Sequence, residues 1–173
     1  MTIEHTELTR RVELRVREHA PTPVLERVDT VHSRLLELES SGVIDDLRTE
    51  TWAGRQSRTA GIVGDTPAAV VDAYRAWASD VGCSLEPAFG RREATSMISA
   101  ASCTEYVVPV VTVAVYDGDR LECVAPCTDG EETVTVEDCL DALAAEADDL
   151  LGAALGRETL DDVHTLERPT SPA

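Results

Sequence analysis

The sequence of 173 residues contains no lysine and no asparagine, and it has a single glutamine and a single phenylalanine. Without lysine there is no phosphate-binding loop of the GxxxxGK[ST] kind. With only 3% aromatic residues, the chain has too few rings for the stacking platforms that bind single-stranded nucleic acid. No apolar run approaches the roughly 20 residues that span a bilayer, and the N-terminus lacks the apolar core of a signal peptide. We therefore expect a globular cytoplasmic protein without a membrane segment.

The charge is strongly one-sided. All fifteen basic residues are arginine, against 33 aspartates and glutamates, which gives a net charge of −18. Lysine, asparagine and phenylalanine have AT-rich codons, so their depletion indicates a GC-rich genome. An acid excess on that background is typical of a halophilic archaeal cytoplasm, where the Debye length falls to about 3 Å or less. The charge then mainly serves solubility. An acidic mesophilic protein is the alternative interpretation.

Five cysteines are present, an odd number, and no CxxC pair occurs. Cys123 and Cys127 are the closest in sequence, but on an extended strand they would lie about 13 Å apart. We expect them to be small buried hydrophobes. A thiol or metal protein that uses Cys123 and Cys127, brought together by a bend at Pro126, is the alternative. Adjacent carboxylates on a helix do not converge on one point, so they are not predicted to form catalytic pairs. No catalytic residue and no cofactor are predicted.

Start and stop signals divide the chain into alternating strands and helices. Residues 11–17 alternate between apolar and charged side chains, which predicts a strand with one charged face. Three helices are predicted: one capped by Thr22 and ended by Gly42, one started by Thr66 and Pro67 and ended by Gly82, and one capped by Thr135 with Asp138. Further strands are predicted over 44–52, 106–116 and 121–125, with loops over 54–64 and 127–134 and no firm assignment for 84–104.

The resulting order is β-α-β-α-(β)-β-β-α, which predicts a single α/β sandwich. A strand-helix-strand unit requires a parallel pair with a right-handed crossover. We expect a loose N-terminus over residues 1–10, one domain over 11–151, and a flexible acidic C-terminal tail over 152–173.

The order of elements resembles the thioredoxin fold. The stretch Tyr106-Val-Val-Pro109 is similar to the proline-led strand of that family, which implies a cis proline facing the active site. Where the family has its redox cysteines, this chain has His19-Ala20-Pro21-Thr22, so the resemblance implies the fold without thiol–disulfide exchange. A ferredoxin-like sheet, with helices on one face only, is the alternative because it suits the charged strand face. Ligands of α/β folds gather at the carboxyl ends of strands, which makes a cleft candidate of Arg17, His19, Thr22 and Pro109.

Residues 27–58 resemble a second family feature, the recognition helix and wing of a winged-helix protein. The resemblance implies that His32, Ser33 and Arg34 face a DNA groove and that Arg48, Arg55 and Arg58 contact phosphates. Residues 1–60 carry a net charge of only −2, against −16 for the rest, which indicates an anion-binding surface or ordinary ion pairing. The whole chain is similar to a family of small halophilic archaeal proteins labelled as helix-turn-helix domains.

We therefore predict a non-enzymatic cytoplasmic regulatory or interaction module, with a protein partner or a second copy of the chain. A winged-helix-like regulator that binds double-stranded DNA through residues 27–58 is the first alternative. The thiol or metal protein described above is the second.

Overall fold

The first strand lies inside a four-stranded sheet in the computed structural model, which describes residues 9–58 and 66–156. The sheet order is β2-β1-β6-β7, with β1 and β2 parallel and the other neighbours antiparallel. The parallel pair follows from the strand-helix-strand connection, and the Asp117-Gly118 turn joins β6 to β7, with Gly118 at φ 57°. The bounds are Arg10–Arg17 (β1), Asp46–Trp52 (β2), Val111–Asp117 (β6) and Arg120–Ala125 (β7).

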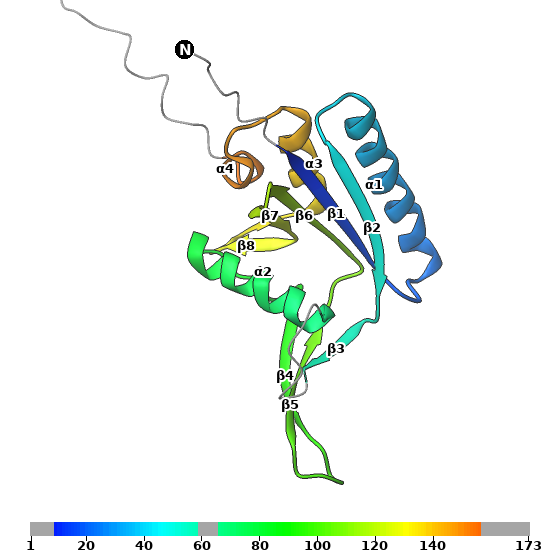
Figure 1. Ribbon diagram of the computed structural model, residues 1–173, viewed down its shortest axis with the longest axis vertical. Coiled ribbons are helices and arrows are strands. Elements are labelled where there is room, and N and C mark those ends of the chain that lie inside the picture. The colour runs from blue at the N-terminus through cyan, green and yellow to red at the C-terminus, as the bar shows by residue number, and fades with distance from the viewer. Residues whose placement is uncertain (1–8, 59–65, 157–173) are drawn as a thin grey trace, which may run out of the picture.

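Helices cover both faces of this sheet (Figure 1). The helices α1 (Thr22–Ser40) and α3 (Val136–Ala144) lie beside each other on one face, over the buried Val12 and Leu14. The helix α2 (Pro67–Val81) lies on the opposite face, and the short helix α4 (Leu150–Ala154) packs on α3 and β7. Mixed strands with helices on both faces confirm the α/β class. The thioredoxin-like arrangement stays a prediction, whereas the ferredoxin-like alternative is wrong because α2 occupies the second face.

The charged face of β1 lies on the same side as α2. Arg11 stacks over the ring of Tyr116 at 4.3 Å, and Arg15 lies over the ring of Trp52 at 5.3 Å. Arg15 also donates to Glu50 at 2.6 Å and to Glu13 at 3.1 Å. A helix can therefore cover the charged face of a strand when the arginines on that face stack on aromatic rings and pair with acids.

Three sequence predictions need correction. The run 106–116 is not one strand: β5 (Ser102–Val107) and β6 are separated around Pro109, which has no N–H to donate to a ladder. Cis bonds among the described residues precede Pro87 and Pro126 instead of Pro109. Thr22 does not cap α1, since Pro21 occupies that position and its carbonyl accepts from Val24 N at 2.9 Å.

Both predicted loops contain strands. The residues Arg55–Arg58 form β3, and the stretch after β7 forms a hairpin of β8 (Cys127–Asp129) and β9 (Glu132–Val134). The unassigned region contains β4 (Gly90–Thr95). The predicted end of the domain falls inside α4, and the predicted tail from residue 157 onward lies outside the described residues, as do residues 1–8 of the loose N-terminus.

The cap of α3 supplies the first testable prediction. The Thr135 hydroxyl accepts from Asp138 N at 3.2 Å, and Thr135 N donates to the Asp138 carboxylate at 2.8 Å, which completes a capping box. Thr135→Ala is expected to lower the free energy of unfolding by about 1 kcal/mol, measured by urea denaturation. Thr133→Ala, at an exposed position two residues earlier, is the control. Equal losses in both variants would contradict a capping role.

Candidate nucleic-acid interface

A second, three-stranded sheet extends away from the main one (Figure 1). It is formed by β3, β5 and β4 in that order, all antiparallel, and residues 96–101 connect β4 to β5. We call this sheet and its connecting turn the arm. Near its base, the Tyr106 hydroxyl donates to Asp72 of α2, and Gln56 Nε2 donates to Ala53 O at 2.7 Å. The arm is therefore held to the body by side chains of β3 and β5, while β4 and β5 continue beyond these contacts.

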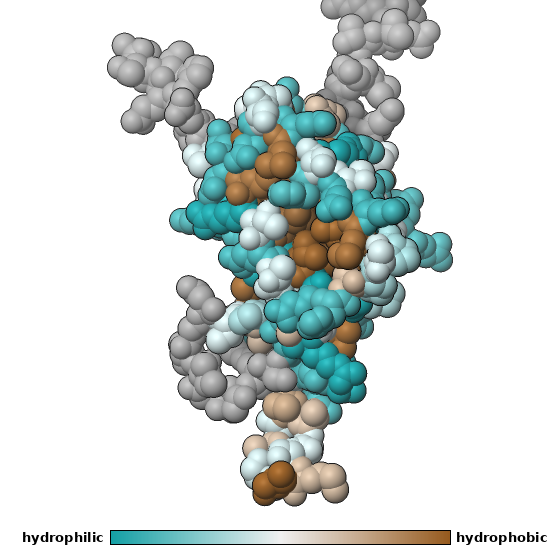
Figure 2. Space-filling view, turned by 90° about the vertical axis from the view of Figure 1, so that its right-hand side faces the viewer, coloured by the Kyte–Doolittle hydropathy of each residue, from teal (hydrophilic) through white to brown (hydrophobic). Residues whose placement is uncertain are grey.

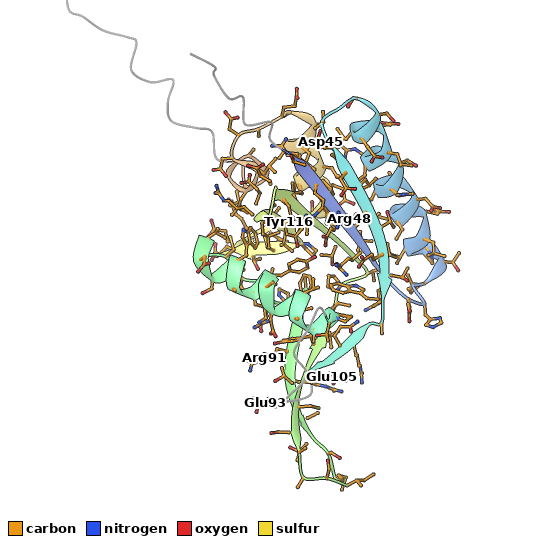
Figure 3. The ribbon with its side chains drawn as sticks, viewed as in Figure 1. Asp45, Arg48, Arg91, Glu93, Glu105 and Tyr116 are labelled. Carbon is orange, nitrogen blue, oxygen red and sulfur yellow. The ribbon has the colours of Figure 1, made fainter. Side chains whose placement is uncertain are left out.

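The arm is basic in an acidic protein. It contains four arginines (Arg55, Arg58, Arg91 and Arg92) against Glu93 and Glu105, a net charge of +2 in a chain of net charge −18. Arg92 pairs with Glu105, and a guanidinium nitrogen of Arg91 lies 3.9 Å from a carboxylate oxygen of Glu93. Figure 3 shows Arg91, Glu93 and Glu105 below α2. Arg55 is exposed and has no acidic partner in the part of the chain that the structure describes. The arm thus offers cationic groups where the rest of the chain offers mainly acids.

The tip of the arm is an ordered turn. The Ser96 hydroxyl accepts from the backbone N of Ile98 and of Ser99, both at 3.3 Å, and Ser96 N donates to Ala101 O at 3.0 Å. Met97 and Ile98 are fully exposed, at 103% and 99%. Figure 2 shows apolar surface at this end of the molecule, apart from the apolar surface of the body. The turn holds two large apolar side chains in water beside small residues.

The predicted recognition helix, α1, presents a different surface. Arg34 pairs with Asp141 of α3 at 2.7 Å, and Arg27 makes a bidentate pair with Glu137 of α3 at 2.7 and 2.8 Å. The hydrogen bonds from Arg27 hold the pKa of Glu137 below its usual range. Ser33 is exposed and His32 half-buried. The remaining exposed charges of α1 are acidic, at Glu26, Asp29 and Glu37, so its outer face would repel phosphates.

The other predicted phosphate contacts are divided between two sheets. Arg48 lies on the edge strand β2 and pairs with Asp46 at 2.9 Å. Arg55 and Arg58 lie on β3 of the arm. The structure therefore places Arg55 and Arg58 in the same small sheet as Arg91 and Arg92, with two arginines on each face. It separates them from Arg34 and Arg48.

Comparison with known families decides the classification. A family model described as a helix-turn-helix domain matches residues 4–148, which is most of the chain. The chain belongs to this helix-turn-helix domain family. No curated protein and no solved structure matches it. Within the matched residues, α1 lies between β1 and β2, and no two of the described helices are joined by a short turn.

Half of the arm of this family member was not predictable from the sequence. Residues 84–104, which contain Arg91, Arg92, Met97 and Ile98, show neither helical nor strand periodicity. One signal was available: Gly90-Arg91-Arg92 is a basic pair inside a strongly acidic half of the chain, and a Met-Ile pair follows among serines and alanines. The basic pair and the Met-Ile pair can be assigned to one surface once the strand pairing is known.

The predicted cleft residues lie near the end of β1. Arg17 Nη1 donates to Val108 O at 3.4 Å, which places Arg17 next to the residue before Pro109. His19 and Thr22 are exposed, and His19 adopts a left-handed φ of 57°. The pockets beside Trp77, beside Cys83 and beside Pro126 are lined by none of these four residues. Arg17 and Pro109 are thus brought close, and a cleft that includes His19 and Thr22 stays a prediction.

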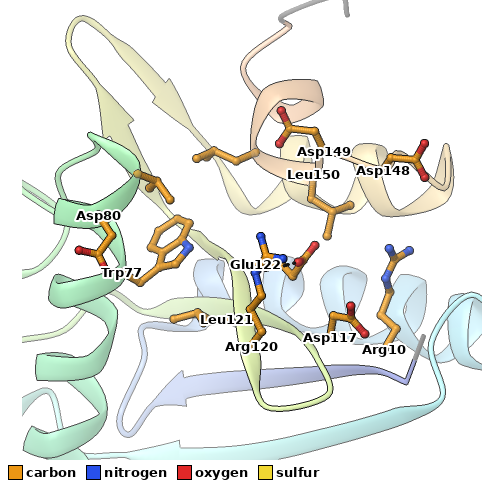
Figure 4. Close-up of a pocket in the computed structure, with 12 residues that line it drawn as sticks. Arg10, Trp77, Asp80, Asp117, Arg120, Leu121, Glu122, Asp148, Asp149 and Leu150 are labelled. Carbon is orange, nitrogen blue, oxygen red and sulfur yellow. Dashed lines mark ion pairs between the residues drawn. The ribbon is translucent and has the colours of Figure 1, made fainter. Parts of the chain in front are cut away.

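A cavity lies elsewhere, between the end of α2, the β6–β7 turn and the start of α4 (Figure 4). Its volume is about 670 Å³. Arg120 pairs with Glu122 across its wall at 3.6 Å, and Asp149 is engaged in capping α4. The remaining lining combines Arg10 and further acids with apolar side chains such as Trp77, Leu121 and Leu150.

The cysteines of β7 and β8 are buried. The Cys123 thiol is hydrogen-bonded to the Cys139 thiol, and this bond together with burial raises the pKa of Cys123. Burial also raises the pKa of Cys127, whose thiol is hydrogen-bonded to Cys83. A raised pKa suppresses the thiolate, which is the reactive form. No group of three or more metal-ligating side chains lies together among the described residues.

These surroundings predict a pattern of thiol reactivity. In the folded protein, Cys83 and Cys103, which are half-buried, are expected to react with iodoacetamide, whereas Cys123, Cys127 and Cys139 are expected to stay protected until the chain unfolds. Peptide mass spectrometry after timed alkylation measures each site. Fast modification of Cys123 or Cys127 at neutral pH would instead favour the thiol-protein alternative.

Proposed function

We propose that this member of the helix-turn-helix domain family is a non-enzymatic cytoplasmic regulator that binds double-stranded DNA through its arm. The observation that carries the proposal is the location of positive charge. The arm has a net charge of +2 and extends from a body that is strongly acidic. The α1 face carries exposed acids, and its arginines are engaged by α3. Arg91 and Arg92 of the arm are also paired, with Glu93 and Glu105, but Arg55 is exposed and the arm as a whole is cationic. The arm is therefore a better candidate for phosphate contact than the recognition helix that the sequence suggested.

Distance separates the tip of the arm from the acids of the body. A six-residue strand such as β4 spans roughly 20 Å. The Debye length is about 8 Å at physiological ionic strength and about 3 Å in molar salt. The repulsion between the acidic body and the part of a duplex at the tip of the arm is therefore screened. Attraction at the short distances between arginines and phosphates is screened less, since such pairs are in direct contact.

The shape of the arm suits a DNA groove. Two-stranded β-ribbons bind DNA in the major or the minor groove, and β4 with β5 continues as such a ribbon past the end of β3. Arginines bind phosphates through bidentate hydrogen bonds, so Arg91 and Arg92 on β4 and Arg55 and Arg58 on β3 would fix the protein on the backbone. Such contacts position a protein without reading sequence.

The proposal is tested by fluorescence anisotropy with a short labelled duplex of mixed sequence. The titration runs from the lowest KCl concentration that preserves the far-UV circular dichroism spectrum up to multimolar KCl. Four phosphate contacts predict that the logarithm of the association constant falls with the logarithm of salt with a slope of about −3.6. The same strand as single-stranded DNA, expected to bind more weakly, is the control. Absence of saturable binding wherever the fold is intact would refute the proposal.

A second candidate is an interaction module that pairs with another copy of the chain. The observation that favours it is the open edge of β2, since the main sheet ends there among the described residues. Such an edge offers unpaired backbone groups to another strand. Sedimentation velocity tests it: a dimer that Thr49→Pro converts to a folded monomer would support edge pairing, and a monomer at all concentrations would exclude it.

No helix of the described residues has the length and apolar character needed to cross a membrane.

A further inference from the structure

The tip of the arm carries a feature that phosphate binding does not use. Met97 and Ile98 are fully exposed, although burial of such side chains is worth about 1.5–3 kcal/mol each. The turn that presents them is ordered by the Ser96 hydroxyl, which accepts from two backbone N–H groups, and by the bond from Ala100 N to Ser96 O at 3.0 Å. These two side chains are therefore held outward by a defined turn.

We propose that Met97 and Ile98 form a wedge that enters the minor groove of duplex DNA and inserts between adjacent base pairs, kinking the duplex. This inference rests on the function proposed above, because the arm must first bind DNA. It names the structural element that deforms the ligand. Methionine and isoleucine are among the side chains that DNA-bending proteins insert between base steps.

The charge of the arm favours nucleic acid as the occupant over an apolar protein surface. Four arginines lie on the same small sheet as the wedge, and only two glutamates accompany them. Among the exposed large hydrophobic residues of the body, Leu25 and Leu36 lie on α1 beside acids. An apolar pair coupled to a cationic support is complementary to a duplex, which presents phosphates outside and stacked bases within.

The size of the tip fits a narrow groove. The minor groove is about 6 Å wide, and the neighbours of the wedge are small, with Ser96 before it and Ser99, Ala100 and Ala101 after it. Ala100 adopts a left-handed φ of 51°, which turns the chain back toward β5. The arginines lie nearer the base of the arm, as Arg91 in Figure 3 shows. They can therefore hold phosphates while the tip reaches the base pairs.

A wedge increases the affinity for DNA through the contacts that a bend permits. Unstacking the base pairs reduces this gain by a few kcal/mol per step. Flexible pyrimidine–purine steps and bulges lower that loss. The wedge therefore predicts a preference for duplexes that are easily kinked, independent of base-specific hydrogen bonds. It also predicts that removal of the wedge abolishes bending while the phosphate contacts persist.

The test compares wild type with Met97→Ser/Ile98→Ser on a duplex labelled with a donor and an acceptor dye at its two ends. Wild type is expected to raise energy transfer on saturation, and the variant is expected to bind about tenfold more weakly with no rise. On a duplex that contains a single-nucleotide bulge, the difference in affinity is expected to shrink. Leu25→Ser/Leu36→Ser, which replaces two apolar residues of α1 that are 44% and 43% exposed, is the matched control and should bend DNA like wild type.

The outcomes separate the wedge from the function on which it rests. Saturable binding without a rise in energy transfer, with equal affinity of the variant, would overturn the wedge and leave DNA binding by the arm intact. Absence of binding by wild type would refute both. If the variant instead changes the sedimentation coefficient and leaves DNA bending unchanged, the tip is a protein contact and the wedge is refuted.

Discussion

Replacement of the four arginines of the arm by glutamine is expected to weaken duplex binding at least tenfold at the lowest KCl concentration that preserves the fold. The variant is Arg55→Gln/Arg58→Gln/Arg91→Gln/Arg92→Gln. Each lost phosphate contact removes the release of about one counterion, so the slope against salt is expected to move from about −3.6 toward zero. Anisotropy across the KCl series measures both quantities. A slope unchanged from wild type would show that other residues bind the phosphates.

The control for this prediction removes two arginines of α1. Arg27→Gln/Arg34→Gln breaks the pairs with Glu137 and Asp141 and is expected to leave DNA affinity and salt slope unchanged. Because Arg92 is bonded to Glu105, the variant Arg55→Gln/Arg91→Gln provides a second comparison in which that pair stays intact. It is expected to lose about half of the slope. An equal loss of DNA affinity and salt slope in the α1 variant and the arm variant would show that α1 also contacts the duplex.

The second large effect concerns the base of the arm. Phe89 immediately precedes β4, is fully buried, and makes an edge contact with the buried ring of Tyr74 at 6.2 Å between ring centres. Phe89→Ala removes most of this side chain and leaves a cavity, so the free energy of unfolding is expected to fall by about 3–5 kcal/mol. That is a large part of the 5–15 kcal/mol typical of native proteins.

Urea denaturation with circular dichroism measures the effect, at a KCl concentration kept constant. Ile98→Ala, at a side chain that is 99% exposed, is the control and is expected to change the free energy of unfolding by less than about 0.5 kcal/mol. A loss below about 1 kcal/mol in Phe89→Ala would mean that the ring is not part of the packed core. A comparable loss in Ile98→Ala would place the tip of the arm against the body.

The elements with local start signals were predictable from sequence. Thr66 accepts from Ala69 N at 3.2 Å at the start of α2, and Thr135 with Asp138 caps α3, as their residue types indicate. These capping interactions join residues within one turn of helix, so a short stretch of sequence is enough to predict them. Thr22 gave a false signal because Pro21, with its fixed φ, took the capping position.

The arm was not predictable in the same way. Arg55 of β3 pairs with Val107 of β5, and β4 pairs with β5 across the turn at Met97. Beyond its base the arm has little apolar alternation, since β4 is mostly exposed, and hydrophobic periodicity reports only burial on one face. The run 106–116 failed for a related reason: its apolar residues serve two sheets, and the break lies around Pro109.

The candidate site likewise has one part that was predictable from the sequence and one part that depends on strand pairing. Arg55 and Arg58 were predicted as phosphate contacts and lie on the arm, but they were grouped with α1 through nearness in sequence. Arg91 and Arg92 join them only through strand pairing over long separations. The ion pairs that engage Arg27 and Arg34 also span more than a hundred residues, to Glu137 and Asp141. Composition alone therefore indicated a basic region without locating its exposed surface.

Site-specific photo-crosslinking measures most directly whether the arm or α1 contacts the duplex. A photoreactive phenylalanine derivative replaces Ser99 at the tip of the arm in one variant and Ser33 on α1 in another, both at exposed positions. Each variant is irradiated with labelled duplex under conditions where wild type is saturated. Covalent adducts from position 99 and none from position 33 are the result that we predict. Adducts from position 33 with none from position 99 would contradict DNA binding by the arm.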